Sequence, residues 1–148
     1  MVTVRDLLRS KGEEGIWAVS PDTSTLDALR FMADRKIGAL IVLDEGILAG
    51  ILSERDLVYR IAENRSIDLE TPIGEYMTSK VITVTSEHTI NDCMNIMVNR
   101  RIRHLPVLDE DKLVGLVSIG DVVKGIISEQ TDKIYNLENF ITGTGYGR

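Results

Sequence analysis

Two short polar segments of the chain combine a serine, an acid and the end of an apolar run. Ser53-Glu54-Arg55-Asp56 follows the apolar residues 47–52, and Ser118-Ile119-Gly120-Asp121 follows residues 112–117. Each segment lies where a predicted strand passes into a predicted helix, so unpaired backbone N–H groups meet the positive helix end there. Such a turn can hold an anion, and its carboxylate can accept hydrogen bonds from a ribose diol. The chemistry that these residues permit is nucleotide binding.

The same spacing also occurs where it has a purely structural meaning. Ser24 precedes Asp27, and Thr89 precedes Asp92, at the start of two other predicted helices. A Ser or Thr followed three residues later by an acid caps a helix N-terminus, because each side chain accepts a backbone N–H. Spacing alone therefore leaves both interpretations, helix cap and binding site, open.

The elements that position these turns come from an internal repeat. Residues 19–61 align with residues 84–126 without a gap, and sixteen aligned pairs are identical, including Asp27/Asp92, Gly50/Gly115 and Asp56/Asp121. Each copy of such a repeat is one supersecondary unit that must bury its apolar face. Two long copies indicate a pseudo-symmetric pair rather than a solenoid, so any pocket between the copies should occur twice.

Hydrophobic periodicity predicts the order strand–helix–strand–strand–helix in each copy. The first copy is expected to use residues 16–19, 24–35, 39–43, 47–52 and 53–63, and the second copy 81–84, 89–100, 104–108, 112–117 and 118–128. Outside the repeat, residues 4–10 predict a short leading helix, and Thr71-Pro72 predicts a capped helix start in the linker 64–79. The tail 130–141 carries an apolar helix face that should dock somewhere, and residues 143–148 are expected to fray.

Composition excludes several classes of protein. The chain has 148 residues, of which 43% are hydrophobic and 27% charged, as expected for a globular domain. Its formal net charge of −6 and its 5% aromatic content argue against a nucleic-acid binder, which needs a basic face or stacking platforms. The sequence shows neither a run long enough for a membrane span nor a secretory leader, which predicts a cytoplasmic protein.

The sequence offers no catalytic or metal-binding constellation. Outside the two serine–aspartate turns, no nucleophile is paired with a base, and neither a P-loop nor a glycine-rich dinucleotide loop occurs. Cys93 is the single cysteine and aligns with Ala28, which predicts a small buried helix position. No metal site is expected at His104, because no cluster of ligands surrounds it in sequence. We therefore expect a binding module rather than an enzyme.

The residues resemble those of a known family, the tandem cystathionine-beta-synthase (CBS) domain, or Bateman module. The matching pieces are the order of elements, Asp44-Glu45 and Asp109-Glu110 at the hairpin turns, and Leu105-Pro106-Val107. The most specific pieces are Gly50 to Asp56 and Gly115 to Asp121, two copies in register of one glycine–serine–aspartate motif. The resemblance covers residues 15–128; Ile41 stands where the second copy has Pro106.

The resemblance implies an α+β fold of two pseudo-symmetric β-α-β-β-α domains packed sheet to sheet, with a short N-terminal helix and a C-terminal helical tail. The implied domains are residues 1–70, with the N-terminal helix, and residues 71–142, with the C-terminal tail, followed by a flexible segment 143–148. Two clefts between such domains commonly bind adenosine-containing ligands, so AMP, ADP, ATP, NAD or NADH is the expected ligand. A homodimer of pairs is expected by the same analogy, with an unknown effector protein as recipient and no attached effector domain.

Carried over by position, each implied cleft combines one serine–aspartate turn with the first two strands of the other copy. The first cleft would use Ser118 and Asp121 for phosphate and ribose, with Trp17, Ile37, Gly38 and Ala39 around the adenine. The second would use Ser53, Arg55 and Asp56, with Val81, Ile82, Ile102, Arg103 and His104. Three basic side chains predict a more highly charged ligand in the second cleft, whereas Trp17 predicts shape and stacking in the first.

Three functions thus remain in view at this point. The favoured one is a sensor that binds an adenine nucleotide and shifts between two arrangements of its copies. A ligand-independent oligomerisation scaffold is the alternative. A nucleic-acid-binding protein ranks behind both, because only residues 100–103 form a basic patch.

Overall fold

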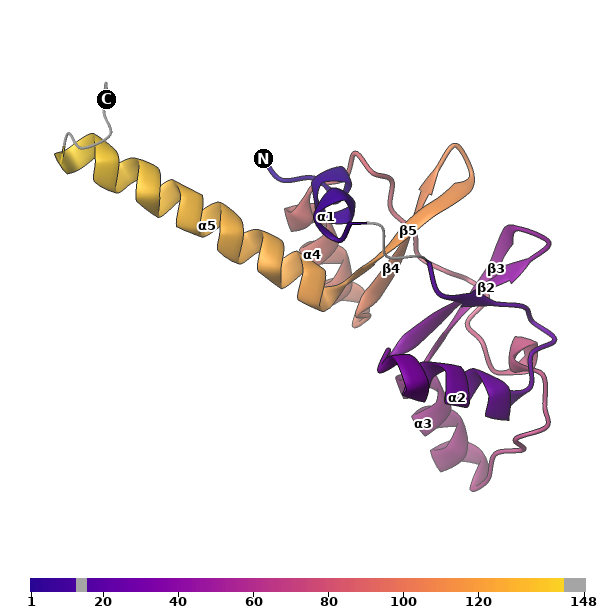
Figure 1. Cartoon of the computed structure of the whole chain (residues 1–148). Helices are drawn as coiled ribbons and strands as arrows, with labels where there is room; N and C mark the ends of the chain where they lie inside the picture. The colour runs from indigo at the N-terminus through magenta and orange to yellow at the C-terminus, as the bar shows by residue number, and fades with distance from the viewer. Residues whose placement is uncertain (13–15, 143–148) are drawn as a thin grey trace. The chain divides into compact units, whose positions relative to one another are not determined.

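The computed structural model describes residues 1–12 and 16–142, which form two compact units. The first-repeat unit contains residues 16–83 and 108–115, and the second-repeat unit contains residues 1–12, 84–107 and 116–142. The predicted fraying of residues 143–148 lies outside the described residues. The elements of both units are labelled in Figure 1.

The first-repeat unit has the predicted order of elements. They are β1 (Ala18–Val19), α2 (Thr25–Arg35), β2 (Ala39–Asp44), β3 (Ile47–Ser53), α3 (Glu54–Asn64) and the 3-10 helix η1 (Ile73–Glu75). The strands form one sheet in the order β1-β2-β3, in which β1 runs parallel and β3 antiparallel to β2. Glu45 and Gly46 both have positive φ, which produces the tight hairpin turn between β2 and β3.

The second repeat keeps this order with a reduced sheet. Its elements are α4 (Ile90–Arg100), β4 (His104–Asp109), β5 (Lys112–Ser118) and α5 (Ile119–Thr142), preceded at the N-terminus by α1 (Val4–Ser10). Strands β4 and β5 pair as a two-stranded sheet. The strand predicted at residues 81–84 is wrong: only Val84 pairs, as a single parallel bridge to Val107.

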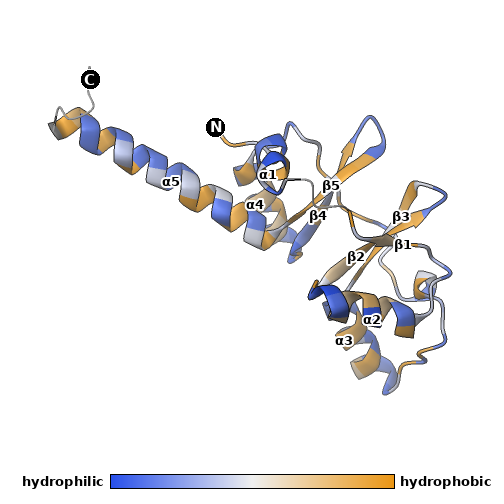
Figure 2. Ribbon diagram, viewed as in Figure 1, coloured by the Kyte–Doolittle hydropathy of each residue, from blue (hydrophilic) through white to orange (hydrophobic). Residues whose placement is uncertain are grey.

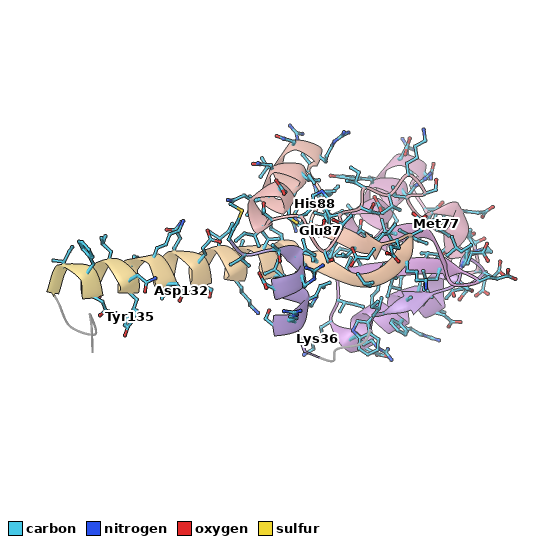
Figure 3. The ribbon with its side chains drawn as sticks, turned by 90° about the horizontal axis from the view of Figure 1, so that it is seen from above. Lys36, Met77, Glu87, His88, Asp132 and Tyr135 are labelled. Atoms are coloured by element: carbon cyan, nitrogen blue, oxygen red, sulfur yellow. The ribbon has the colours of Figure 1, made fainter. Side chains whose placement is uncertain are left out.

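Helix α5 is longer than predicted. The helix expected at residues 118–128 and the tail expected at 130–141 form one continuous helix of 24 residues. Its last turns extend away from α1 and α4 (Figure 1), and Asp132 and Tyr135 lie on this extension in Figure 3. The tail therefore does not dock on the rest of its own unit; Ile134, Leu137 and Ile141 are exposed.

The cores of the two units occupy equivalent positions. The first-repeat core contains Ala28, Met32, Leu40, Val42, Leu52, Leu57 and Ile73. The aligned residues of the second repeat are buried too: Cys93, Met97, Leu105, Val107, Val117, Val122 and, before the repeat, Val4. Figure 2 shows these apolar strands and helix faces in orange. The repeat thus reflects equivalent packing in the two copies, because each copy must bury the same apolar face.

The leading segment of each copy packs on the other copy. Val4 N donates to His88 O at 2.8 Å, and in the equivalent place Ile73 N donates to Thr23 O at 2.8 Å. A second pair of bonds, Arg5 N to Ser86 O and Gly74 N to Pro21 O, repeats at 3.0 Å each. The segment before the first copy therefore docks on the second copy, and the segment before the second copy docks on the first.

This exchange changes two expectations from the sequence. The implied first domain of residues 1–70 includes the N-terminal helix, but α1 packs with α5 in the second-repeat unit, and η1 packs in the first. Thr71 does not cap a helix, because the N-cap position of η1 is Pro72; the Thr71 carbonyl accepts from Thr25 N at 2.9 Å and from Thr25 Oγ1 at 2.6 Å. Helix η1 begins after Pro72, without a side-chain cap.

Candidate functional site

Both serine–aspartate turns are helix caps. In the first, Asp56 N donates to Ser53 Oγ at 3.2 Å and Ser53 N donates to Asp56 Oδ2 at 3.3 Å. In the second, Asp121 N donates to Ser118 Oγ at 3.2 Å and Ser118 N donates to Asp121 Oδ2 at 2.9 Å. The capping interpretation is confirmed at both turns, since these are the two reciprocal bonds of a capping box.

The turns at Asp56 and Asp121 differ from the caps at Ser24 and Thr89, because their carboxylates accept an additional hydrogen bond. Asp56 Oδ2 also accepts from Thr78 Oγ1 at 3.3 Å, and Asp121 Oδ2 also accepts from Lys11 Nζ at 3.0 Å. Among the described residues, Asp92 accepts hydrogen bonds only from Thr89, the residue that it caps. The carboxylates after β3 and β5 therefore bind a donor from outside their helix, which spacing could not reveal.

Thr78 and Lys11 make equivalent contacts with different groups: each bonds to the aspartate of its turn and to a carbonyl of the preceding strand. Thr78 N donates to Ile51 O at 2.9 Å while Thr78 Oγ1 reaches Asp56. In the second-repeat unit, Lys11 Nζ alone makes both contacts, at 2.9 Å to Leu116 O and 3.0 Å to Asp121. Because Leu116 aligns with Ile51, one ammonium replaces a backbone N–H and a hydroxyl. The pair Lys11–Asp121 is half-buried, with side-chain exposures of 30% and 18%.

Gly50 explains how Thr78 comes so close to β3. A Cβ on Gly50 would lie 2.6 Å from Met77 Sδ and 2.7 Å from the carbonyl oxygen of Thr78. That carbonyl accepts from Ile51 N at 3.0 Å, so the 77–78 segment runs against β3 as an extra pairing partner. The glycine of the motif is therefore a packing requirement that places the outside donor on Asp56.

Electrostatics favour ionised Asp121. Burial, the largest single influence, raises its pKa, but hydrogen bonds from Ser118 and the hydrogen bond and charge of Lys11 together lower the pKa below its ordinary value. Both bonded donors lie on Oδ2, and among the described residues Oδ1 accepts no hydrogen bond. The turn thus presents a carboxylate oxygen that can accept a hydroxyl donor.

Each turn lies beside the strand that starts its own hairpin. Glu54 N donates to Gly38 O at 3.0 Å, and Ile119 N donates to Arg103 O at 2.8 Å. The structure thus brings Ser118 next to Arg103 and His104, and Ser53 next to Gly38 and Ala39. Two residues that the sequence assigned to the other cleft, Arg103 and His104, are therefore backbone neighbours of the Ser118 turn.

Trp17 has partners within the first-repeat unit. It is 43% exposed and is therefore not a core tryptophan. The Arg35 guanidinium lies 4.6 Å from the centroid of the Trp17 ring and 3.7 Å from that of Phe31, and the two rings meet edge to face at 5.9 Å. An arginine above an indole is a cation–π contact, so one face of the Trp17 ring is covered.

The Arg55 side chain bonds to a residue of its own helix, α3. Its Nη2 donates to Tyr59 Oη at 3.1 Å. A shallow hollow of about 340 Å³ lies here, lined by Glu54, Arg55, Val58 and Tyr59. Tyr59 is a candidate ligand contact that the sequence reasoning did not include, because its aligned residue is Lys124 and no motif marks it.

The remaining predicted residues divide between the units. Ser53, Arg55, Asp56, Val81 and Ile82 belong to the first-repeat unit with Trp17, Ile37, Gly38 and Ala39, while Ser118, Asp121, Ile102, Arg103 and His104 belong to the second. Each implied cleft therefore takes residues from both units, and the combination remains a prediction.

The single cysteine lies in the core of the second-repeat unit. Cys93 is fully buried, and burial raises its thiol pKa to about 11, as expected of an inert core position. Within residues 1–12 and 16–142, no three His, Cys, Asp or Glu side chains gather where a metal ion could bind. No helix in the described ranges is long and apolar enough to cross a membrane.

Two copies of one supersecondary unit, each with a capped strand-to-helix turn that carries a carboxylate, define a tandem-repeat protein of the α+β class. The family described as CBS domain matches residues 14–63 and 73–128. The chain therefore belongs to the CBS domain family and is a tandem CBS pair, as the sequence motifs predicted.

Individual relatives agree with this assignment. The chain is 37% identical over 153 residues to the mitochondrial CBS domain-containing protein CBSX3 of Arabidopsis thaliana, covering 97% of this chain and 73% of that protein. A putative signal-transduction protein with CBS domains from Burkholderia ambifaria has a similar structure, with a TM-score of 0.82, 40% identity and coverage of 87% and 96%. CBSX2, solved in complex with AMP, has a TM-score of 0.72 and 27% identity, with coverage of 88% and 99%.

Proposed function

We propose that this CBS pair is a regulatory sensor of an adenosine-containing nucleotide and is not an enzyme. The observation that carries the proposal is the twin turn: Asp56 and Asp121 each keep Oδ1 without a partner among the described residues, beside a helix N-terminus. A ribose diol supplies donors for such an oxygen, and a phosphate suits the nearby helix end. The AMP complex of CBSX2 supports this ligand class.

Each proposed cleft is lined by the residues that the family resemblance implies. Ser118 and Asp121 bind phosphate and ribose with Trp17, Ile37, Gly38 and Ala39 at the adenine; Ser53, Arg55 and Asp56 act with Val81, Ile82, Ile102, Arg103 and His104. AMP, ADP, ATP, NAD and NADH all carry the required group. Ligand binding shifts the population of the two arrangements by its differential affinity, and an effector protein detects that shift. The proposed compartment is the cytoplasm.

A homodimer is the proposed assembly, and helix α5 supports it. Exposed Ile127, Ile134 and Ile141 recur every seventh residue, while Val123 and Leu137 lie four residues before Ile127 and Ile141, respectively. Isoleucine and leucine at these heptad positions favour pairing of two helices. A dozen residues of isolated helix are only marginally stable in water, so a second copy of α5 would stabilise this extension. In sedimentation, Leu137→Asp should shift a dimer to the monomer mass, whereas a wild-type monomer would refute the proposal.

The ligand proposal is tested by thermal unfolding with AMP, ADP, ATP, NAD, NADH and, as control, GMP. At a hundred times its dissociation constant, a ligand specific for the folded protein stabilises it by about 2.7 kcal/mol. That energy corresponds to a rise in Tm of roughly 5–10 °C. Asp56→Asn and Asp121→Asn should each reduce the rise, whereas Asp92→Asn, which changes a capping carboxylate without an outside donor, should leave the ligand-induced rise intact.

The alternative function is a ligand-independent scaffold. It would give no rise in Tm with any nucleotide at saturating concentration, while the dimer persists in sedimentation. A rise that is the same in wild type, Asp56→Asn and Asp121→Asn would instead place the ligand away from both turns.

A further inference from the structure

The two turns differ in the charge of the outside donor. Asp56 is held by the neutral hydroxyl of Thr78 at 3.3 Å, whereas Asp121 is held by the ammonium of Lys11 at 3.0 Å. The ammonium also donates to Leu116 O at 2.9 Å and comes from the C-cap of α1. The carboxylate proposed to take a ribose is thus neutralised in one unit and not in the other.

Counting acceptor sites shows what a ribose diol displaces when its two hydroxyls bond to both carboxylate oxygens of Asp121. A carboxylate oxygen has two lone-pair directions, and those of Asp121 Oδ2 are taken by Ser118 N and Lys11 Nζ. The Ser118 bond belongs to the helix cap and is fixed by the backbone. A diol that bonds to both carboxylate oxygens therefore displaces Lys11, the flexible partner.

We propose that Lys11 makes the Asp121 turn selective for phosphorylated adenosine ligands, by exchanging its carboxylate partner for the ligand phosphate when the ribose takes Asp121. The inference rests on the proposed function, because it requires an adenosine ligand at this turn. A nucleoside without phosphate displaces Lys11 and gives it no anion in return. A nucleotide supplies a new anion next to the helix N-terminus, within reach of the long lysine side chain.

The same reasoning predicts weaker selectivity at the Asp56 turn. Displacing Thr78 Oγ1 removes a neutral hydrogen bond, which costs less than separating an ammonium from a carboxylate. Because Thr78 N still donates to Ile51 O, the 77–78 segment stays in place after the displacement. Thr78 is therefore the matched control for Lys11.

The test measures AMP and adenosine affinity by isothermal titration in an Asp56→Asn background, which leaves only the Asp121 turn intact. Adding Lys11→Met should strengthen adenosine binding and weaken AMP binding, so that the ratio of the two affinities falls by about tenfold or more. Lys11→Arg, which keeps the charge, should preserve the ratio. In an Asp121→Asn background, Thr78→Val should change both affinities by similar factors.

The outcomes distinguish this inference from the function on which it rests. If AMP and adenosine bind but Lys11→Met changes both affinities equally, Lys11 only anchors α1 and the inference is wrong. If Lys11→Met unfolds the protein, Lys11→Arg decides: a fall of the AMP-to-adenosine affinity ratio in this variant, which keeps the charge, would make the inference wrong. If neither ligand binds wild type, the proposed function fails, and this inference fails with it.

Discussion

Replacing Gly50 by alanine should destabilise the first-repeat unit more than its single added methyl group implies. The new Cβ would lie 2.6 Å from Met77 Sδ, which can move, and 2.7 Å from the backbone oxygen of Thr78, which accepts from Ile51 N. Relieving the second contact requires breaking the pairing of the 77–78 segment with β3. Overpacking of this kind costs about 1–3 kcal/mol, and we expect the upper half of that range.

The assay is urea unfolding followed by circular dichroism, which reports the helices of both the unit of Gly50 and the unit of Gly125. The matched control is Gly125→Ala, where the added Cβ would lie 2.8 Å from Leu7 Cδ2, the end of a flexible side chain. There the gain in helix propensity, about 1 kcal/mol, offsets the crowding, so we expect almost no change. A Gly50→Ala protein within about 0.5 kcal/mol of wild type would refute the packing argument, since such a value is ordinary for an exposed surface site.

Three further predictions concern single residues. Asp111→Gly should stabilise the second hairpin by about 0.5–1 kcal/mol in urea unfolding, because Asp111 has a φ of 63° where the first hairpin has Gly46. Cys93 should react with a thiol reagent at pH 8 only as fast as the protein unfolds, because it is buried and its pKa is raised to about 11; a burst of reaction in the native protein would contradict this. The folded-state pKa of Asp121 is lowered, so its ion pair with Lys11 stabilises above about pH 4 and is lost as pH falls through that pKa. Wild type should exceed Lys11→Met in stability by about 0.5–1 kcal/mol at pH 7, and the difference should narrow as pH falls below about 4.

The sequence predicted the parts of the fold that depend on local pattern. Helices α2 and α4 and strands β2, β3, β4 and β5 lie within one or two residues of their predicted ranges, because hydrophobic periodicity and caps act over a few residues. The continuous α5 was missed because Ser128 and Gln130 interrupt the apolar pattern without breaking the backbone. The strand at residues 81–84 was overpredicted, since apolar residues alone do not supply a pairing partner.

The candidate site was predictable only in part. The repeat motif located Ser53, Asp56, Ser118 and Asp121, since the capping geometry is encoded within four residues. Lys11 was invisible, because it lies 110 positions from Asp121 and outside the aligned repeat. An alignment of residues 4–11 with residues 73–80 would have shown that both segments end in Ser-Lys. It would not have shown which residue of each segment donates a hydrogen bond to an aspartate.

Each leader, the segment that precedes a repeat copy (residues 4–11 or residues 73–80), docks on the other copy. This exchange explains why two such similar copies can have different sites. Val4 and Ile73 are both fully buried and make matching backbone bonds, so the two leaders are anchored in the same way. Beyond that anchor they differ: one presents Thr78 to its carboxylate and the other presents Lys11. The repeat cores and capping boxes must stay alike, because they hold each unit together. The leader is under no such constraint after its anchor, so it is the place where charge at a turn can change without any cost to the core. The difference in charge beside the two carboxylates therefore arises in part from the segments outside the repeat.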